Sequence, residues 1–173
     1  MLATADVACF LLRLRDDDEG EVRRAVRTLA PIVRDRGGAF LIDGRVNLAR
    51  DVDADGAHVA AADGAVARQE LGPDRSLGIE CGLSRHLAME AADLGADYVA
   101  MGSYGADPAP AILEMVTWWA PLFVVPCVAW ATSVEEAAFL AKAGSDFVAV
   151  CDPVWAHERG AIAGLEAIAA ALG

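Results

Sequence analysis

The sequence predicts an α/β protein: a curled parallel sheet of about seven strands covered by helices, in a single domain spanning residues 1–173. Short apolar runs alternate with stretches in which apolar residues recur at helical spacing, the pattern of parallel strands joined by helices. One phrase, an aspartate followed by a short apolar run, returns at Asp6, Asp55, Asp97 and Asp146, at intervals of 49, 42 and 49 residues. Two strand–helix units in each such interval are typical of a TIM-type barrel.

Seven segments are predicted to be strands, because each is a short apolar run bounded by turn residues. They lie near residues 7–14, 39–43, 56–60, 77–81, 98–102, 122–128 and 146–151. A TIM-type barrel needs eight strands to close. We therefore expect a barrel that lacks its first strand–helix unit. Its two unpaired strand edges would favour a homo-oligomer.

Four helices are predicted from apolar residues at helical spacing, over residues 21–36, 84–94, 133–143 and 161–172. Ser133 is the expected N-cap of the third of these helices. Gly95 and Gly144 each follow an alanine-rich helix, where a glycine takes the left-handed conformation without strain. Each of these two helices is therefore expected to end at its glycine, just before an aspartate and a buried strand.

The net charge excludes several classes of partner. The 14 basic and 26 acidic side chains give a charge of −12, whereas nucleic acids and anionic membranes attract proteins with surplus cations. A hydrophobic fraction of 55% indicates a substantial core, but no run of about 18 apolar residues predicts a membrane span. The first residues lack the pattern of a signal peptide. The four cysteines form no metal motif and are expected to be buried and reduced, which favours a cytoplasmic location.

Basic side chains follow the first two predicted strands. In a parallel barrel the functional residues follow the carboxyl ends of the strands. Arg13, Arg15 and Arg45 are therefore expected at one mouth of the barrel, where guanidinium groups bind phosphate or carboxylate. The alternative is that each arginine pairs with a nearby aspartate, such as Asp43 or Asp63, and only neutralises the rim.

Two other side-chain types in these strands have competing interpretations. His58 falls in the middle of a predicted strand and is expected to be a hydrogen-bonded interior histidine rather than a base. Trp130 and Trp155 lie near strand ends, where their rings would flank a flat ligand.

Seven stretches of the chain resemble a known family in order and spacing. They are residues 7–16, 40–49, 55–59, 84–91, 95–102, 126–129 and 143–150. They resemble thiamine-phosphate synthase and look most like its alphaproteobacterial branch. The resemblance covers nearly the whole chain, apart from the family's first strand and helix.

The resemblance implies a reaction, a cofactor and a set of site residues. The family joins a hydroxymethylpyrimidine diphosphate to a thiazole phosphate, forming thiamine monophosphate and releasing diphosphate. The pyrimidine diphosphate ionises to a carbocation, which the thiazole nitrogen attacks. The resemblance implies small phosphorylated thiamine precursors as partners and Mg²⁺ as cofactor. The substrate-binding positions that it implies are Arg13, Arg15, Asp43, Arg45, Ser103, Trp130, Cys151 and Asp152.

The chain departs from the family pattern at several of its working positions. Gly44 stands where the family has a magnesium-binding aspartate, and glycine offers Mg²⁺ no side-chain oxygen, so Asp63 is the one matched metal ligand. Glu80 replaces a small hydroxyl residue, and its carboxylate would repel a diphosphate. The Thr-x-Thr-Lys loop that clamps diphosphate is absent, Trp130 occupies a glycine pair, and Asp152 adds a negative charge.

These departures leave three hypotheses, and the sequence leaves open whether the chain is an enzyme. The first is a thiamine-phosphate synthase with weak or lost catalysis. The second is an enzyme like the thiazole tautomerase, with Glu80 as the candidate catalytic base, although the histidine expected nearby is replaced by Gly82. The third is a pseudoenzyme that binds a ligand or partner in a pocket lined by Trp130, Trp155 and Tyr104.

Overall fold

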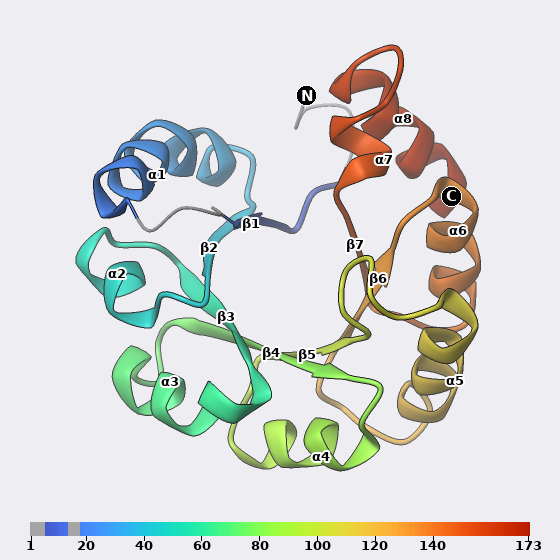
Figure 1. Ribbon diagram of the computed structural model, residues 1–173, viewed down its shortest axis with the longest axis horizontal. Coiled ribbons are helices and arrows are strands. Elements are labelled where there is room, and N and C mark those ends of the chain that lie inside the picture. The colour runs from blue at the N-terminus through green and yellow to red at the C-terminus, as the bar shows by residue number, and fades with distance from the viewer. Residues whose placement is uncertain (1–5, 14–17) are drawn as a thin grey trace.

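A computed structural model describes residues 6–13 and 18–173 of the chain. Seven parallel strands form one sheet in sequence order, with β1 and β7 at its two ends. Figure 1 shows that the sheet curls and stays open between β1 and β7. The predicted fold class, a TIM-type barrel short of one strand–helix unit, is confirmed. The strands are β1 (Cys9–Leu12), β2 (Ala39–Asp43), β3 (Gly56–Ala60), β4 (Ser76–Gly82), β5 (Tyr98–Met101), β6 (Cys127–Ala131) and β7 (Phe147–Val150).

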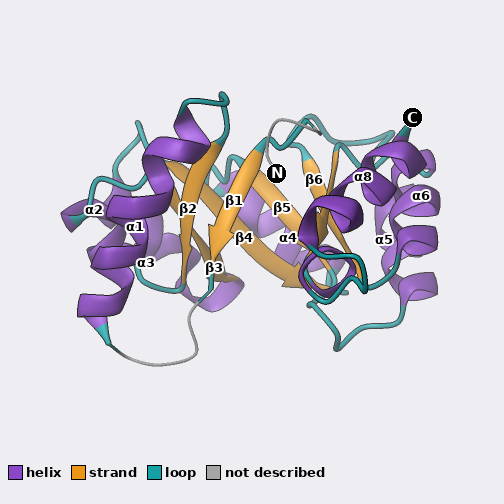
Figure 2. Cartoon of the chain, turned by 90° about the horizontal axis from the view of Figure 1, so that it is seen from above, coloured by secondary structure: helices purple, strands orange, loops and turns teal. Residues whose placement is uncertain are grey.

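Helices cover the outer face of the sheet (Figures 1 and 2). They are α1 (Glu19–Arg34), α2 (Val46–Asp51), α3 (Gly64–Leu71), α4 (Arg85–Asp93), α5 (Ala109–Trp119), α6 (Val134–Lys142), α7 (Asp152–Trp155) and α8 (Ala161–Leu172), with the 3₁₀ turn η1 (Ala61–Asp63) before α3. The four predicted helices are α1, α4, α6 and α8. The helices α2 and α7 are too short to show a period. In the part of the chain that the structure describes, no helix is long and apolar enough to cross a membrane.

The predicted helix ends are confirmed at three positions. The Ser133 side chain caps α6 by accepting a hydrogen bond from the backbone N–H of Glu136, at 3.1 Å. Gly95 and Gly144, which follow α4 and α6, have φ angles of 81° and 107°. Such angles favour glycine, so both residues can end a helix in the way that the sequence predicts.

The predicted bounds of the sixth strand are wrong. The strand β6 begins at Cys127, and the apolar residues before it form a turn in which Val124 is fully exposed. This turn is held to α5 by aromatic packing: the rings of Trp119 and Phe123 stack with their centroids 3.9 Å apart. The Trp119 indole N–H also donates to the carbonyl of Val125 at 2.8 Å. Because β6 extends to Ala131, Trp130 lies inside this strand, whereas the predicted strand ended at residue 128.

Three of the four repeated aspartates have the same structural role. Each carboxylate accepts a backbone N–H from the start of the neighbouring, preceding strand of the sheet. The bonds run to Asp55 from Phe40 at 2.7 Å, to Asp97 from Leu77 at 2.8 Å and to Asp146 from Cys127 at 2.8 Å. Hydrogen bonds to an ionised acceptor are stronger than neutral ones, so these contacts fix where each strand pair begins.

The two end strands are less buried than the strands between them. Cys9 of β1 is exposed, and Phe147 of β7 is 46% exposed. The expectation that all four cysteines are buried is therefore wrong for Cys9, which lies on an uncovered edge, and correct for Cys81 and Cys127. One aromatic contact crosses the opening between β1 and α7, with the ring centroids of Phe10 and Trp155 6.4 Å apart.

The open edges should be visible in amide hydrogen exchange. Backbone N–H groups of β1 and β7 that face the opening have no neighbouring strand to bond, so they should exchange about tenfold faster than those of β3 and β4. Exchange followed by NMR or mass spectrometry on the monomeric chain tests this. Equal protection of β1, β7 and the central strands would show that something covers the edges in solution.

Candidate functional site

The candidate site lies inside the curled sheet and extends from Asp43, at the carboxyl end of β2, across β3 and β4 to Tyr98, at the start of β5. The register of the strands places Asp43 of β2 beside His58 of β3, and His58 beside Gly78 of β4. Gly78 in turn pairs with Tyr98 of β5. Because side chains alternate between the two faces of a strand, these four positions share the inner face of the sheet. Glu80, two residues after Gly78, shares that face.

Gly78 allows Tyr98 to reach His58 across β4. A Cβ atom at position 78 would lie 2.0 Å from Cζ of the Tyr98 ring, so only a glycine fits beneath it. The Tyr98 hydroxyl lies 2.9 Å from Nδ1 of His58, and the two rings stack. Burial raises the pKa of the Tyr98 phenol above its ordinary value, so the hydroxyl keeps its proton. The contact therefore orients the imidazole.

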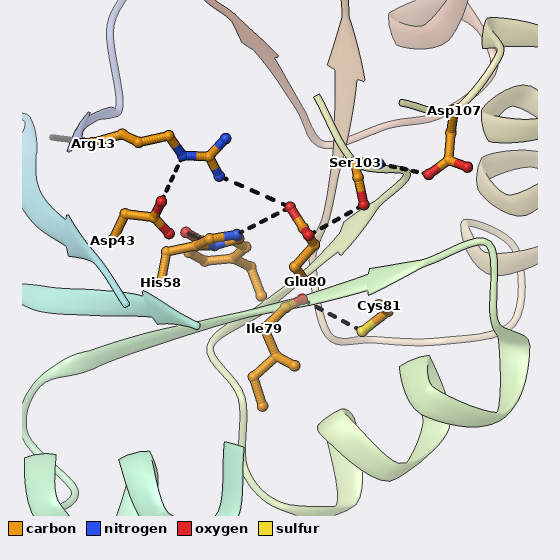
Figure 3. A network of polar contacts seen from close by, with 9 residues as sticks. Arg13, Asp43, His58, Ile79, Glu80, Cys81, Ser103 and Asp107 are labelled. Carbon is orange, nitrogen blue, oxygen red and sulfur yellow. Dashed lines mark hydrogen bonds and ion pairs between the residues drawn. The ribbon is translucent and has the colours of Figure 1, made fainter. Parts of the chain in front are cut away.

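The Arg13 guanidinium lies between two carboxylates (Figure 3). Its Nε donates to Oδ2 of Asp43 at 2.5 Å, and its Nη2 lies 4.0 Å from Oε2 of Glu80. The side chains of Asp43 and Glu80 are only about a quarter exposed, so solvent screens these contacts incompletely. Of the two sequence-based interpretations of Arg13, pairing with a nearby aspartate is the one that the geometry confirms.

Glu80 is the centre of the polar contacts drawn in Figure 3. Its Oε1 accepts a hydrogen bond from the Ser103 hydroxyl at 3.1 Å, and its Oε2 lies 4.0 Å from Nε2 of His58. The His58 imidazole, the Ser103 hydroxyl and the Arg13 guanidinium lower the pKa of the Glu80 carboxyl, against the opposite effect of partial burial. Glu80 is therefore held in its ionised form.

His58 is an interior histidine, as the sequence predicts. It is 2% exposed, and its Nδ1 is paired with Tyr98. Its Nε2 atom has no hydrogen-bond partner, and neither has the indole N–H of Trp130, which is also buried. The rings of His58 and Trp130 meet edge to face, with centroids 6.3 Å apart. Two buried polar atoms without partners therefore lie on neighbouring rings in the interior.

Aromatic side chains pack next to this network. The Trp130 ring packs edge to face against Tyr104, with centroids 5.5 Å apart, and the Arg13 guanidinium lies 5.6 Å from the centroid of the same tryptophan. The Tyr104 hydroxyl accepts a hydrogen bond from the backbone N–H of Asp152 at 2.8 Å. Burial raises the pKa of Tyr104 to about 12, so this hydroxyl is neutral at physiological pH. These contacts hold the Trp130 and Tyr104 rings together beside Arg13.

The remaining predicted site residues are placed around the network. Arg15 lies outside the described residues. Arg45 is the N-cap residue of α2, and Cys151 is the N-cap residue of α7, with Asp152 next to it at the start of that helix. Trp155, at the end of α7, is 53% exposed and contacts Phe10 rather than the Trp130 ring. Of the predicted site residues, the structure brings together five: Arg13, Asp43, Glu80, Ser103 and Trp130.

The residues present do not fit the magnesium site that the resemblance implies. Mg²⁺ needs oxygen ligands, usually one or two carboxylates together with waters and substrate phosphates. Position 44 is glycine, Asp63 is an exposed residue of η1, and the Asp43 carboxylate is already bound to Arg13. Within residues 6–13 and 18–173, no three His, Cys, Asp or Glu side chains are grouped so that they could hold a metal ion.

Comparison with known sequences decides the family. A sequence model described as thiamine monophosphate synthase matches residues 1–154. The chain belongs to the thiamine monophosphate synthase family. The thiamine-phosphate synthase of Rhodospirillum centenum is 42% identical over 172 residues, which cover 92% of this chain and 81% of that protein. The thiamine-phosphate synthase of Erythrobacter litoralis is 38% identical over 177 residues, covering 95% of this chain and 83% of that protein.

Solved structures agree with this family. A thiamine phosphate pyrophosphorylase from Pyrococcus furiosus superposes with a TM-score of 0.85 at 26% identity, covering 99% of this chain and 85% of that chain. A 3-hexulose-6-phosphate synthase shares the fold with a TM-score of 0.71 at 16% identity, covering 96% of this chain and 88% of that chain. The family resemblance that the sequence predicts is thereby confirmed, as is its alphaproteobacterial character.

The sequence does not indicate that Tyr98 belongs to the network. It places Tyr98 as the first residue of a strand, and it predicts His58 to be hydrogen-bonded without naming its partner. A signal was present, because Gly78 interrupts the apolar run Leu77–Ile79, and a glycine inside a strand often marks a close approach of another group. The partner that approaches, Tyr98, depends on the strand register.

Substitution of Gly78 by alanine should destabilise the fold. The new Cβ would displace the Tyr98 ring and separate its hydroxyl from His58, at a cost of about 1–3 kcal/mol in the free energy of unfolding. Urea denaturation of wild type and Gly78→Ala measures the loss. In a Tyr98→Ala background the new methyl group has room, so the added cost should shrink. An unchanged cost there would contradict the role given to Tyr98.

Stability should depend on pH through Glu80. Its pKa is lower in the folded chain than the value of about 4.3 expected when unfolded, so its ionised form adds stability above that pH and this contribution is lost as the pH falls through the folded value. Glu80→Gln should therefore be less stable than wild type at neutral pH, and the difference should shrink on acidification. Urea denaturation at a series of pH values tests this. Glu114→Gln, on the exposed side of α5, is the control. A difference that stays constant with pH would refute the role of the charge.

Proposed function

We propose that this chain is a thiamine-phosphate synthase family protein in which the coupling of hydroxymethylpyrimidine diphosphate with thiazole phosphate is lost or very weak. The observation that carries the proposal is the state of Arg13. Its single positive charge is shared by the carboxylates of Asp43 and Glu80, so it has little attraction left for a diphosphate. Preorganised positive charge at the leaving group is usually the largest contribution to catalysis of this kind.

Two further features support weak catalysis. Trp130 and Tyr104 place aromatic rings in the mouth, where the family's glycine pair would leave backbone amides accessible to a phosphate. The oxygen ligands that Mg²⁺ would need are also incomplete. The proposed ligands remain phosphorylated thiamine precursors, bound in a cytoplasmic protein, and self-association through the open edges remains a prediction.

One observation favours the second hypothesis, an enzyme like the thiazole tautomerase. The histidine that the sequence lacks at position 82 is supplied from β3, because Nε2 of His58 lies 4.0 Å from Glu80. A carboxylate and an imidazole are the kinds of group that act as general base and acid without a metal. If the chain catalyses neither the synthase reaction nor the isomerisation of a thiazole phosphate, the third hypothesis, a pseudoenzyme, is indicated.

The synthase proposal is tested by direct assay of the purified 173-residue chain. With both phosphorylated precursors and Mg²⁺, we expect a turnover at least about 10³-fold below the rate of about 1 per second at the low end of typical enzymes. Formation of thiamine monophosphate and diphosphate is measured, with the Rhodospirillum centenum enzyme as the positive control. Turnover near 1 per second would overturn the proposal. Isomerisation of a thiazole phosphate precursor without metal would select the tautomerase hypothesis.

A further inference from the structure

The Glu80 carboxylate is surrounded by donors from three different parts of the sheet. The Ser103 hydroxyl, after β5, donates to Oε1 at 3.1 Å. On the other side, Nη2 of Arg13 and Nε2 of His58 each lie 4.0 Å from Oε2. Figure 3 shows these three side chains converging on the carboxylate from different directions. Both oxygens of a planar, singly charged group are therefore faced by polar groups.

The His58 imidazole gives independent evidence that this space suits a ligand. His58 is 2% exposed, and its Nε2 has no hydrogen-bond partner although it faces the carboxylate. When the Tyr98 hydroxyl donates to Nδ1, the ring hydrogen is on Nε2. Buried donors are nearly always paired in folded proteins. The Glu80 carboxylate lies 4.0 Å from this donor, too far for a hydrogen bond. Its attachment to the backbone of β4 limits how closely the carboxylate can approach.

We propose that the space enclosed by Ser103, His58 and Arg13 is a binding site for a small carboxylate, and that the chain fills it with its own Glu80 side chain. In the wild-type chain the Glu80 carboxylate thus occupies the position that a free carboxylate would take. The proposal concerns binding alone and stands whether or not the chain turns over thiamine precursors.

Charge favours a monocarboxylate over a phosphate in this space. The Arg13 guanidinium already pairs with Asp43, so one further negative charge leaves the group of three with a net charge of −1. A phosphate dianion would bring a second excess charge into a partly buried site, where repulsion is poorly screened. A carboxylate also offers two oxygens in one plane, one toward Ser103 and one toward His58 and Arg13.

Chemical rescue tests the proposal. Glu80→Ala removes a CH₂–COO⁻ group, which corresponds to acetate, so acetate is the matched probe. Thermal unfolding of the variant is followed at pH 7 in sodium acetate and in sodium chloride of equal ionic strength. We expect acetate to raise the Tm of Glu80→Ala by about 3 °C when present at roughly ten times its dissociation constant, with no such rise in wild type.

Three controls decide between outcomes. Glu114→Ala removes an exposed carboxylate from α5 and should show no acetate effect. The double variant with Ser103→Ala should lose the rescue, because it lacks the hydroxyl that holds Oε1. An equal Tm rise in wild type or Glu114→Ala, no rise in Glu80→Ala, or greater stabilisation of Glu80→Ala by phosphate than by acetate would each overturn the proposal. If Glu80→Ala does not fold, Glu80→Ser is measured in the same way.

Because the readout is stability, this test is separate from the synthase assay. Failure of the rescue would leave the low turnover to be explained by Trp130 and the missing magnesium ligand. Full turnover in the wild type would overturn the proposed loss of catalysis without affecting the acetate result.

Discussion

Strand register is the constraint on which this site depends, and three carboxylates help to set it. Asp55, Asp97 and Asp146 each accept the backbone N–H at the start of the neighbouring strand, so the pairs begin at defined residues. A slip of one residue would turn His58 and Glu80 from the inner face of the sheet to its outer face. The repeated aspartates that indicate the fold in the sequence therefore also help to align the strands that carry the site.

The inner face of the sheet carries the charged side chains of the candidate site. The inner row of side chains still converges as in any parallel barrel, since backbone geometry decides which residues face inward. Two carboxylates on this face, Asp43 and Glu80, lie against the guanidinium of Arg13.

The opening between β1 and β7 follows from the number of strands. Seven parallel strands cannot complete the closed pattern of eight, so two edges stay free. Asp6 precedes the apolar residues of β1, just as Asp55 precedes those of β3. The match covers 81% of the synthase from Rhodospirillum centenum and 85% of the pyrophosphorylase from Pyrococcus furiosus. The exposure of Cys9 and Phe147 is the local consequence of this free edge.

The sequence by itself determined the fold class, the order of the strands, the four longer amphipathic helices and the family, because periodicity and repeated phrases are local properties. It failed at β6, where an apolar run packs on α5 as a turn, since apolar character alone does not distinguish a strand from a packed turn. Only the tertiary structure decided the site. Arg13 meets Asp43 across 30 residues of chain, and Tyr98 meets His58 across 40. Contacts of this range depend on register. Gly78 marks a close approach in the sequence, but only the register shows that Tyr98 is the side chain that approaches.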